Sequence, residues 1–105
     1  MRLVIDASVA VEILLQTSVG QRAAAALNDA ILLAPELLDA EVLAVLRREV
    51  LGGRLDEGRA LEAVEDLRDW DIDRLPHVDL LERAWGYRHD ATPYDALYLA
   101  VADAF

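Results

Sequence analysis

The chain contains no cysteine and no lysine, and it has few aromatic residues, at 6% of its 105 positions. Without cysteine it can form neither a disulfide framework nor a thiolate metal site. No apolar run approaches the roughly 18–20 residues that a membrane-spanning helix needs. The early run Leu3–Ile5 is interrupted by Asp6, which excludes a signal-peptide core there. These absences predict a cytoplasmic protein that does not contact a membrane.

Basic charge is also scarce. Ten arginines stand against twenty acidic residues, which gives a formal net charge of −10. Such a chain repels the phosphate backbone of a nucleic acid at long range, so composition alone disfavours a simple electrostatic nucleic-acid binder. Two features would offset this repulsion: divalent cations held by a carboxylate cluster, or a basic partner docked on the acidic surface.

Apolar residues are plentiful, at 55% of the chain, which excludes a disordered polypeptide. The length predicts one domain over residues 1–105. A domain of this size buries only about 60–65% of the surface of its unfolded chain. We therefore expect self-association, as a homodimer, through the apolar faces of the helices between Val9 and Leu51.

The spacing of apolar residues predicts three strands, over residues 2–6, 31–34 and 71–75. A first helix is expected to begin near Val9 with Ser8 as its cap, and a last helix to begin at Thr92-Pro93. Between them the pattern predicts helices over residues 19–29, 36–51, 55–70 and 77–89. This β-α-α-β-α-α-β-α-α order indicates the α/β class, with a parallel sheet covered by helices on both faces.

Asp6 lies at the carboxyl end of the first predicted strand. Ligands of open parallel sheets bind just beyond that end, so an acid there is a candidate metal ligand or catalytic group. A turn-forming Asp that caps the following helix through its own side chain explains the residue equally well. The sequence leaves both interpretations of Asp6 open.

Glu41 lies within a predicted helix, where its neighbours on the helix surface include the apolar Leu37 and Val45. A carboxylate buried among such residues must be either bound to a metal or paired with a base, such as Arg48. Asp39 points away from Glu41 on the same helix and is expected to be a solvated surface acid.

Asp95 occupies the third position of the last predicted helix, after the N-cap Thr92. This spacing is close to a capping box, in which an acid bonds back to the cap residue. The same geometry would also present Asp95 near the carboxyl edge of the sheet, where Asp6 lies. Asp90 in the preceding loop is either a supporting acid or solvated, and His77 is expected to be a surface or capping group.

Three segments together resemble the motifs of the PIN-domain family, and in particular its VapC-type toxin ribonucleases of bacterial type II toxin–antitoxin systems. They are residues 1–9, a hydrophobic strand ending in Asp6; residues 35–48, a helix that carries Glu41; and residues 92–102, a helix that begins around Asp95. The stretch Leu-Leu-Glu-Arg-Ala-Trp at residues 80–85 is also typical of bacterial VapC toxins.

The resemblance implies a PIN-like three-layer α/β/α domain and a metal-dependent endoribonuclease. Asp6, Glu41 and Asp95 would be its catalytic carboxylates and the ligands of Mg²⁺ or Mn²⁺, hard cations that oxygen ligands favour. RNA would be the substrate, hydrolysed at its phosphodiester bonds. A cognate VapB-type antitoxin would be the inhibitory partner.

The chain departs from the family pattern at its end. The family usually continues past the helix of Asp95 into a final strand and a fourth acidic residue, whereas this sequence ends at Phe105. We therefore expect a C-terminally short PIN-like domain that lacks the final strand, binds metal weakly and cuts RNA slowly. Either the chain is a truncated form, or another residue such as Asp90, or a partner, completes the site. The alternative is a non-catalytic PIN-like module that binds an antitoxin or itself. A haloacid-dehalogenase-type phosphatase is disfavoured, because that family needs a second Asp where Ser8 stands.

Overall fold

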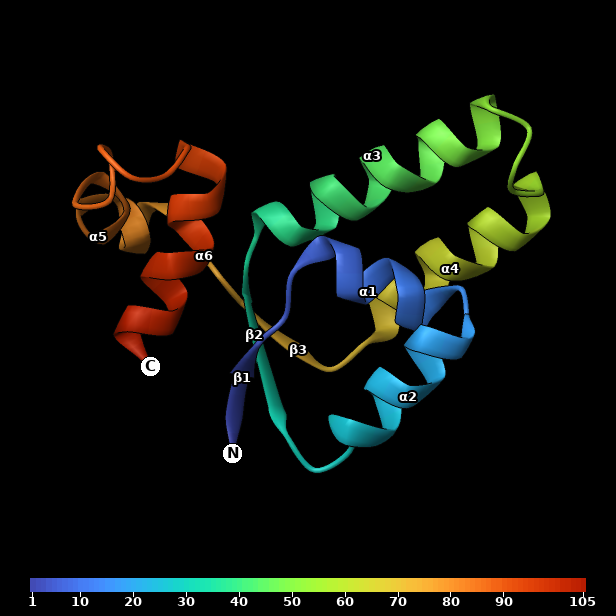
Figure 1. Cartoon of the computed structure of the whole chain (residues 1–105), viewed down its shortest axis with the longest axis horizontal. Helices are drawn as coiled ribbons and strands as arrows, with labels where there is room; N and C mark the ends of the chain where they lie inside the picture. The colour runs from blue at the N-terminus through green and yellow to red at the C-terminus, as the bar shows by residue number, and fades with distance from the viewer.

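Three parallel strands form the centre of the molecule in the computed structural model, which describes residues 1–105 (Figure 1). They lie in the order β1 (Arg2–Val4), β2 (Ile31–Pro35) and β3 (Ile72–Leu75). The helices are α1 (Ala7–Leu14), α2 (Ser18–Ala26), α3 (Leu37–Leu51), α4 (Glu57–Asp69), α5 (Leu81–Trp85) and α6 (Pro93–Ala104), with a 3₁₀ turn over His77–Leu80. The α/β class and the parallel sheet predicted from the sequence are confirmed. No helix combines the length and the apolar character needed to cross a bilayer.

Alternation along the strands sends their side chains to two different clusters, because successive residues of a strand point to opposite faces. Leu32 and Ala34 of β2 belong to a cluster of twelve buried residues beneath α1, α3 and α4, and we call this side the large face. The intervening Leu33 points the other way. There it joins a cluster of four, the small face, formed by Leu33, Leu80, Ala100 and Val101.

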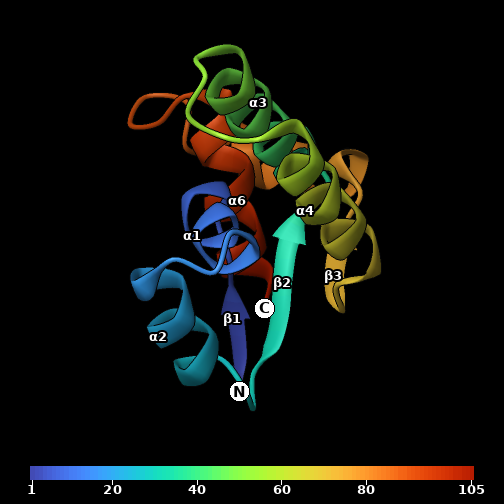
Figure 2. The ribbon, with the colours of Figure 1, turned by 90° about the vertical axis from the view of Figure 1, so that its right-hand side faces the viewer.

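Helices cover both faces of the sheet, because the segment after β3 crosses to the small face and forms α5 and α6 there (Figure 2). The crossovers from β1 to β2 and from β2 to β3 place α1, α3 and α4 on the large face, since consecutive crossovers of one hand lie on one side of a sheet. α6 then returns along the small face, where it packs against β1, β2 and α5. These layers are the α/β/α arrangement that the sequence predicted.

The first helix begins earlier than predicted. Asp6, rather than Ser8, is the N-cap of α1: its carboxylate accepts the backbone N–H of Val9 at 3.0 Å. Asp6 can do so because its backbone is extended, with φ −101° and ψ 171°, as an N-cap requires. The predicted cap Ser8 instead donates its hydroxyl to Asp6, and α1 therefore starts at Ala7.

The single helix predicted over residues 77–89 was wrong. The structure has the 3₁₀ turn, then the five-residue α5, then turns as far as Asp90. The helix ends at Gly86, whose N–H is shared between the carbonyls of Glu82 and Arg83, an arrangement common at helix ends. Glycine is also the weakest helix former after proline, so the apolar pattern beyond it does not extend the helix.

The close contact between α1 and α2 depends on a glycine. A Cβ atom at Gly20 would lie 1.9 Å from the backbone carbonyl oxygen of Glu12, far inside van der Waals contact. Nearby, Thr17 caps α2 by accepting the N–H of Gly20, and its hydroxyl also bonds to the Glu12 carboxylate. No larger residue fits at position 20 without separating the two helices.

Candidate metal-binding site

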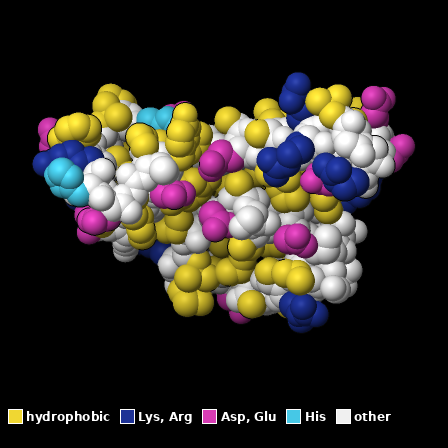
Figure 3. All heavy atoms as spheres, turned by 45° about the horizontal axis from the view of Figure 1, so that its top comes forward, with side chains coloured by type: hydrophobic (Ala, Val, Ile, Leu, Met, Phe, Trp, Pro, Cys, Tyr) yellow, Lys and Arg dark blue, Asp and Glu magenta, His cyan; other side chains and the backbone are white.

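A pocket of about 650 Å³ lies beyond the carboxyl end of β1, between α3 and α6. The acids predicted as site residues, Asp6, Glu41 and Asp95, all lie in its wall, together with Asp90. In the space-filling view, acidic side chains surround the hollow between the part of the molecule formed by α5 and α6 and the remainder (Figure 3). The structure thus brings residues from three distant segments to one cavity. The strand-end position of Asp6 and the helix-start position of Asp95 predicted that these two would meet, and the resemblance implied that Glu41 would join them.

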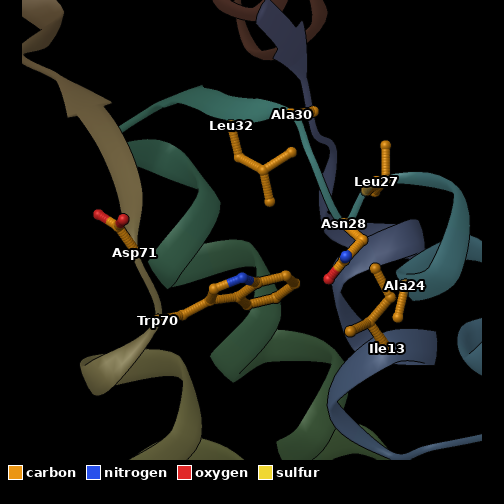
Figure 4. Close-up of a pocket in the computed structure, with 8 residues that line it drawn as sticks. All are labelled: Ile13, Ala24, Leu27, Asn28, Ala30, Leu32, Trp70 and Asp71. Atoms are coloured by element: carbon orange, nitrogen blue, oxygen red, sulfur yellow. The ribbon is translucent and has the colours of Figure 1, made fainter. Parts of the chain in front are cut away.

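A second cavity, of about 300 Å³, lies at the opposite end of the strands. Its lining is mostly apolar, with the Trp70 ring, Leu32 and Asn28 facing into it (Figure 4). Asp71 is the single ionisable side chain among its eight lining residues. It offers no pair of carboxylates and no base, so we assign no chemistry to it.

Asp6 both caps a helix and keeps one oxygen available. Ser8 Oγ and the N–H of Val9 donate to Asp6 Oδ1, at 2.9 and 3.0 Å, whereas Oδ2 has no protein donor. Asp6 continues the alternation of β1, so its side chain lies on the same side as Val4, which also lines the pocket. The two interpretations of Asp6 that the sequence left open are therefore compatible.

Glu41 is half-buried and is held by a phenol rather than by a base. The hydroxyl of Tyr98 on α6 donates to Glu41 Oε1 at 2.6 Å, and Oε2 has no donor. No ion pair joins Glu41 to Arg48, so that alternative was wrong. Burial, followed by the hydrogen bond and charge of Glu41, raises the pKa of Tyr98 well above its ordinary value of 10.0. Tyr98 therefore remains a protonated donor at neutral pH.

The N-terminus of α3, which carries Glu41, is fixed to the 3₁₀ turn by a reciprocal pair of bonds. Nε2 of His77 accepts the N–H of Leu37 at 2.9 Å, and the N–H of His77 donates to Glu36 Oε1 at 3.1 Å. His77 is thus a capping group, one of the two roles predicted for it. Because Glu41 follows Leu37 by about one helical turn, these two hydrogen bonds restrict the position of Glu41.

Asp39 was expected to be a solvated surface acid; its side chain is 40% exposed, but it also has a partner that the sequence did not predict. Both of its oxygens accept Nε of Arg74 on β3, at 3.0 and 2.8 Å. Arg74 also donates to the carbonyl of Leu67 at 2.8 Å, so the pair joins α3 to β3 and to the end of α4. A helix position alone could not reveal this partner, which comes from a strand 35 residues further along the chain.

Asp95 uses its backbone, but not its carboxylate, in capping α6. The N–H of Asp95 donates to Oγ1 of Thr92 at 3.2 Å. The return bond of a capping box, from the Thr92 N–H to the Asp95 carboxylate, is not formed. Because neither carboxylate oxygen has a protein donor and the residue is exposed, helix capping does not account for an acid at this position.

The pocket has no basic side chain to balance its acids. Its wall contains four carboxylates and no Arg, Lys or His, and none of the four is in an ion pair. Carboxylates that share a pocket without a base repel one another, and oxygen-only donors match the preference of Mg²⁺ or Mn²⁺. As the side chains lie, no group of three or more His, Asp or Glu residues is close enough to hold one ion. The donor chemistry thus fits a hard cation, although the carboxylates do not form a closed coordination shell.

Two polar neighbours of the acids were given no role in the site by the sequence. Ser8 donates to Asp6, and Tyr98 donates to Glu41. Tyr98 had a detectable signal, because it follows Asp95 by three residues and so lies on the same face of α6. Nothing in the sequence indicated that its partner is Glu41, which lies 57 residues away on another helix.

Comparison with known families identifies the fold. The family model of the PIN domain matches residues 3–104, nearly the whole chain. The chain therefore belongs to the PIN-domain family, as the resemblance of its motifs predicted.

The relatives of this chain within the family are named VapC ribonucleases. The chain is 46% identical over 79 residues to Ribonuclease VapC1 of Mycobacterium tuberculosis, a match that covers 74% of this chain and 59% of that protein. It is 35% identical over 102 residues to VapC ribonuclease Mb0985 of Mycobacterium bovis, covering 97% and 78%. It is 31% identical over 101 residues to Ribonuclease VapC12 of Mycobacterium tuberculosis, covering 96% and 78%. This chain thus spans less than two thirds of the length of VapC1 and more than three quarters of the other two.

Proposed function

We propose that the protein is a divalent-metal-dependent endoribonuclease, the toxin component of a VapBC-type system. One observation carries the proposal: Asp6, Glu41 and Asp95 line one pocket, each has a carboxylate oxygen without a protein donor, and no base balances them. The names of the relatives support RNA as the substrate.

In this proposal, Asp6 and Asp95 bind Mg²⁺ or Mn²⁺ directly. Glu41 binds the same ion, directly or through water, or orients the attacking water. The bound metal supplies a Lewis acid for the phosphodiester and lowers the pKa of a coordinated water. Asp90, in the same pocket wall, supports the site as a further acid. The four acids of the pocket wall repel the RNA backbone, and a cation held by them would reduce that repulsion.

Thermal unfolding with and without metal tests this site. Binding to the folded state alone stabilises it by about 2.7 kcal/mol at a hundredfold excess of metal over Kd. Mg²⁺ or Mn²⁺ should therefore raise the Tm of the wild type, and Asp6→Asn or Asp95→Asn should abolish the rise. Asn replaces Asp at an N-cap at little cost, so Asp6→Asn keeps α1 intact. Asp66→Asn, at an exposed acid of α4 outside the pocket, is the matched control and should keep the full rise.

Cleavage of RNA should require the same metal and the same residues. A wild type whose Tm does not respond to either metal would refute the metal site. A normal response without cleavage would favour the second candidate, a PIN-like module that binds an antitoxin or itself. The net charge of −10 specifically favours that candidate, because it suits a basic partner better than RNA.

We also propose two protein partners, a VapB-type antitoxin and a second copy of the chain. Support for a homodimer comes from exposed apolar side chains on the helices between Val9 and Leu51, including Val19 and Leu43. Light scattering at tens of micromolar should therefore give twice the mass of the chain. A monomer at that concentration would count against the dimer without bearing on the metal site.

A further inference from the structure

α3 and α6, which carry acids on the two sides of the pocket, pack against different parts of the fold. α3 packs on α1, α4 and β2, whereas α6 packs on β1, β2, α5 and the 3₁₀ turn. A single side-chain hydrogen bond joins the two helices directly, from the Tyr98 hydroxyl to Glu41 Oε1 at 2.6 Å. Both helices also pack on β2, and this bond is the direct side-chain link across the pocket between Glu41 and the helix that carries Asp95.

The chemistry of this contact differs from that of the other acid held on α3. Asp39 is held by the guanidinium of Arg74, which neutralises it. Glu41, two residues further on, is held by a neutral phenol. A phenol orients a carboxylate through one strong hydrogen bond but leaves its negative charge uncompensated. A carboxylate that binds a cation must keep its orientation and its full negative charge. A neutral hydrogen-bond donor such as a phenol allows both.

We propose that Tyr98 is a positioning residue of the candidate metal site: it fixes Glu41 through Oε1, so that Oε2 is presented to the ion. The inference depends on the proposed function, because it assigns Tyr98 a role toward the same metal. Tyr98 itself binds neither the metal nor the reacting phosphate in this scheme. Tyr98 follows Asp95 by three residues, so the two lie on one face of α6. That face would supply both the ligand Asp95 and the residue that orients the ligand Glu41.

Tyr98→Phe tests the role, because it removes one hydroxyl and keeps the ring that packs in the pocket wall. Groups that orient a metal ligand commonly contribute 10–100-fold in metal affinity, so calorimetric titration with Mn²⁺ should show binding weakened about tenfold. Tyr94→Phe is the matched control: it lies on the same helix, its side chain is 60% exposed, and its hydroxyl has no partner in the protein. Tyr94→Phe should bind Mn²⁺ like the wild type.

A second pair of variants separates positioning from simple stabilisation of the fold. In a Glu41→Gln background the Tyr98→Phe change should have no further effect on Mn²⁺ affinity, since the carboxylate that Tyr98 orients is already lost. Unfolding of the metal-free variants, measured alongside, reports any structural contribution of the hydroxyl.

If the Tyr98→Phe variant is less stable than the wild type but binds Mn²⁺ equally tightly, the inference is overturned and the proposed function is unaffected. An equal loss of affinity in the Glu41→Gln background would overturn it as well. A wild type that binds no Mn²⁺ would refute the metal site itself, and the role of Tyr98 with it.

Discussion

The two faces of the sheet differ in how much they bury. The large face joins twelve buried residues contributed by the strands, α1, α3 and α4, whereas the small face joins four. Because buried apolar area supplies most of the stability of a domain, the helices of the large face are held more firmly. α6, on the small face, is fixed by fewer buried side chains and should open at a lower free energy than α3.

The candidate site spans the boundary between these two halves. Asp6 and Glu41 come from the start of α1 and from α3, which pack in the large face, whereas Asp95 and Tyr98 come from α6. One wall of the pocket is therefore fixed by a large core, and the other is carried by a helix with a small one. This difference gives the hydrogen bond between Tyr98 and Glu41 a role: it helps to fix the distance between α3 and α6, which core packing on the small face fixes only weakly.

The largest expected effect comes from removing a core side chain on each face. Leu38 of the large face and Leu80 of the small face are almost fully buried, at 0% and 1% exposed. Leu→Ala changes in cores cost about 2–5 kcal/mol, with the larger values where the cavity cannot collapse. We expect about 4 kcal/mol for Leu38→Ala and about 2–3 kcal/mol for Leu80→Ala in urea unfolding.

Hydrogen exchange of the same two variants sharpens the comparison. Leu80→Ala should accelerate exchange in α6 and leave α3 protected, because only the small face loses contacts. Leu38→Ala should accelerate both helices together, since it weakens the larger cluster. Equal acceleration of α3 and α6 in Leu80→Ala would mean that the two faces unfold as one unit.

Much of this arrangement could be predicted from local sequence. Short apolar runs indicated the strands, and Thr92-Pro93 indicated the start of α6 to the residue. A common location for Asp6 and Asp95 could be predicted from position, because the carboxyl end of β1 and the N-terminus of α6 meet at one edge of the sheet, whereas Glu41 was added by the resemblance to the PIN-domain motifs. These features depend on periodicity and capping, which a sequence carries directly.

Other features could not be predicted, because they join elements far apart in the chain. The partner of Asp39 is Arg74 and that of Glu41 is Tyr98, and each pairing depends on how helices and strands lie in space. The cap of the first helix could not be decided from the sequence for a different reason. Asp6 and Ser8 both suit an N-cap, and only the extended backbone at residue 6 decides between them.

A smaller effect is expected at the contact of α2 with α1, which lies away from both the small face and the pocket. Gly20→Ala would force a Cβ against the backbone of α1, and such overpacking costs about 1–3 kcal/mol. Gly58→Ala, in the first turn of α4, is the control: its Cβ would meet only the movable Asp56 side chain, at 3.1 Å, so the change should alter stability by no more than about 1 kcal/mol. Chemical denaturation measures both. Because α2 supplies no residue to the pocket, any metal-induced rise in Tm should be the same in both variants.

The smallest effect is expected at the exposed end of α3, where Arg54 lies 2.7 Å from Glu49. The hydrogen bond from Arg54 holds the pKa of Glu49 below its ordinary value of 4.5. A depressed carboxyl pKa means that the contribution of the pair to stability is present above about pH 4.5 and is lost as the pH falls through the folded-state pKa.

Arg54→Gln tests this contact. The variant should return the pKa of Glu49 toward 4.5, as measured by NMR titration of the Glu49 carboxyl carbon. Because both side chains are solvated, the change in unfolding free energy should be too small to resolve. Salt at 0.5 M should reduce the pKa shift only in part, because the 2.7 Å hydrogen bond that is its main cause is shorter than the screening length of about 4 Å. A large loss of stability in Arg54→Gln would show that the end of α3 is part of the firmly held half rather than a solvated extension of it.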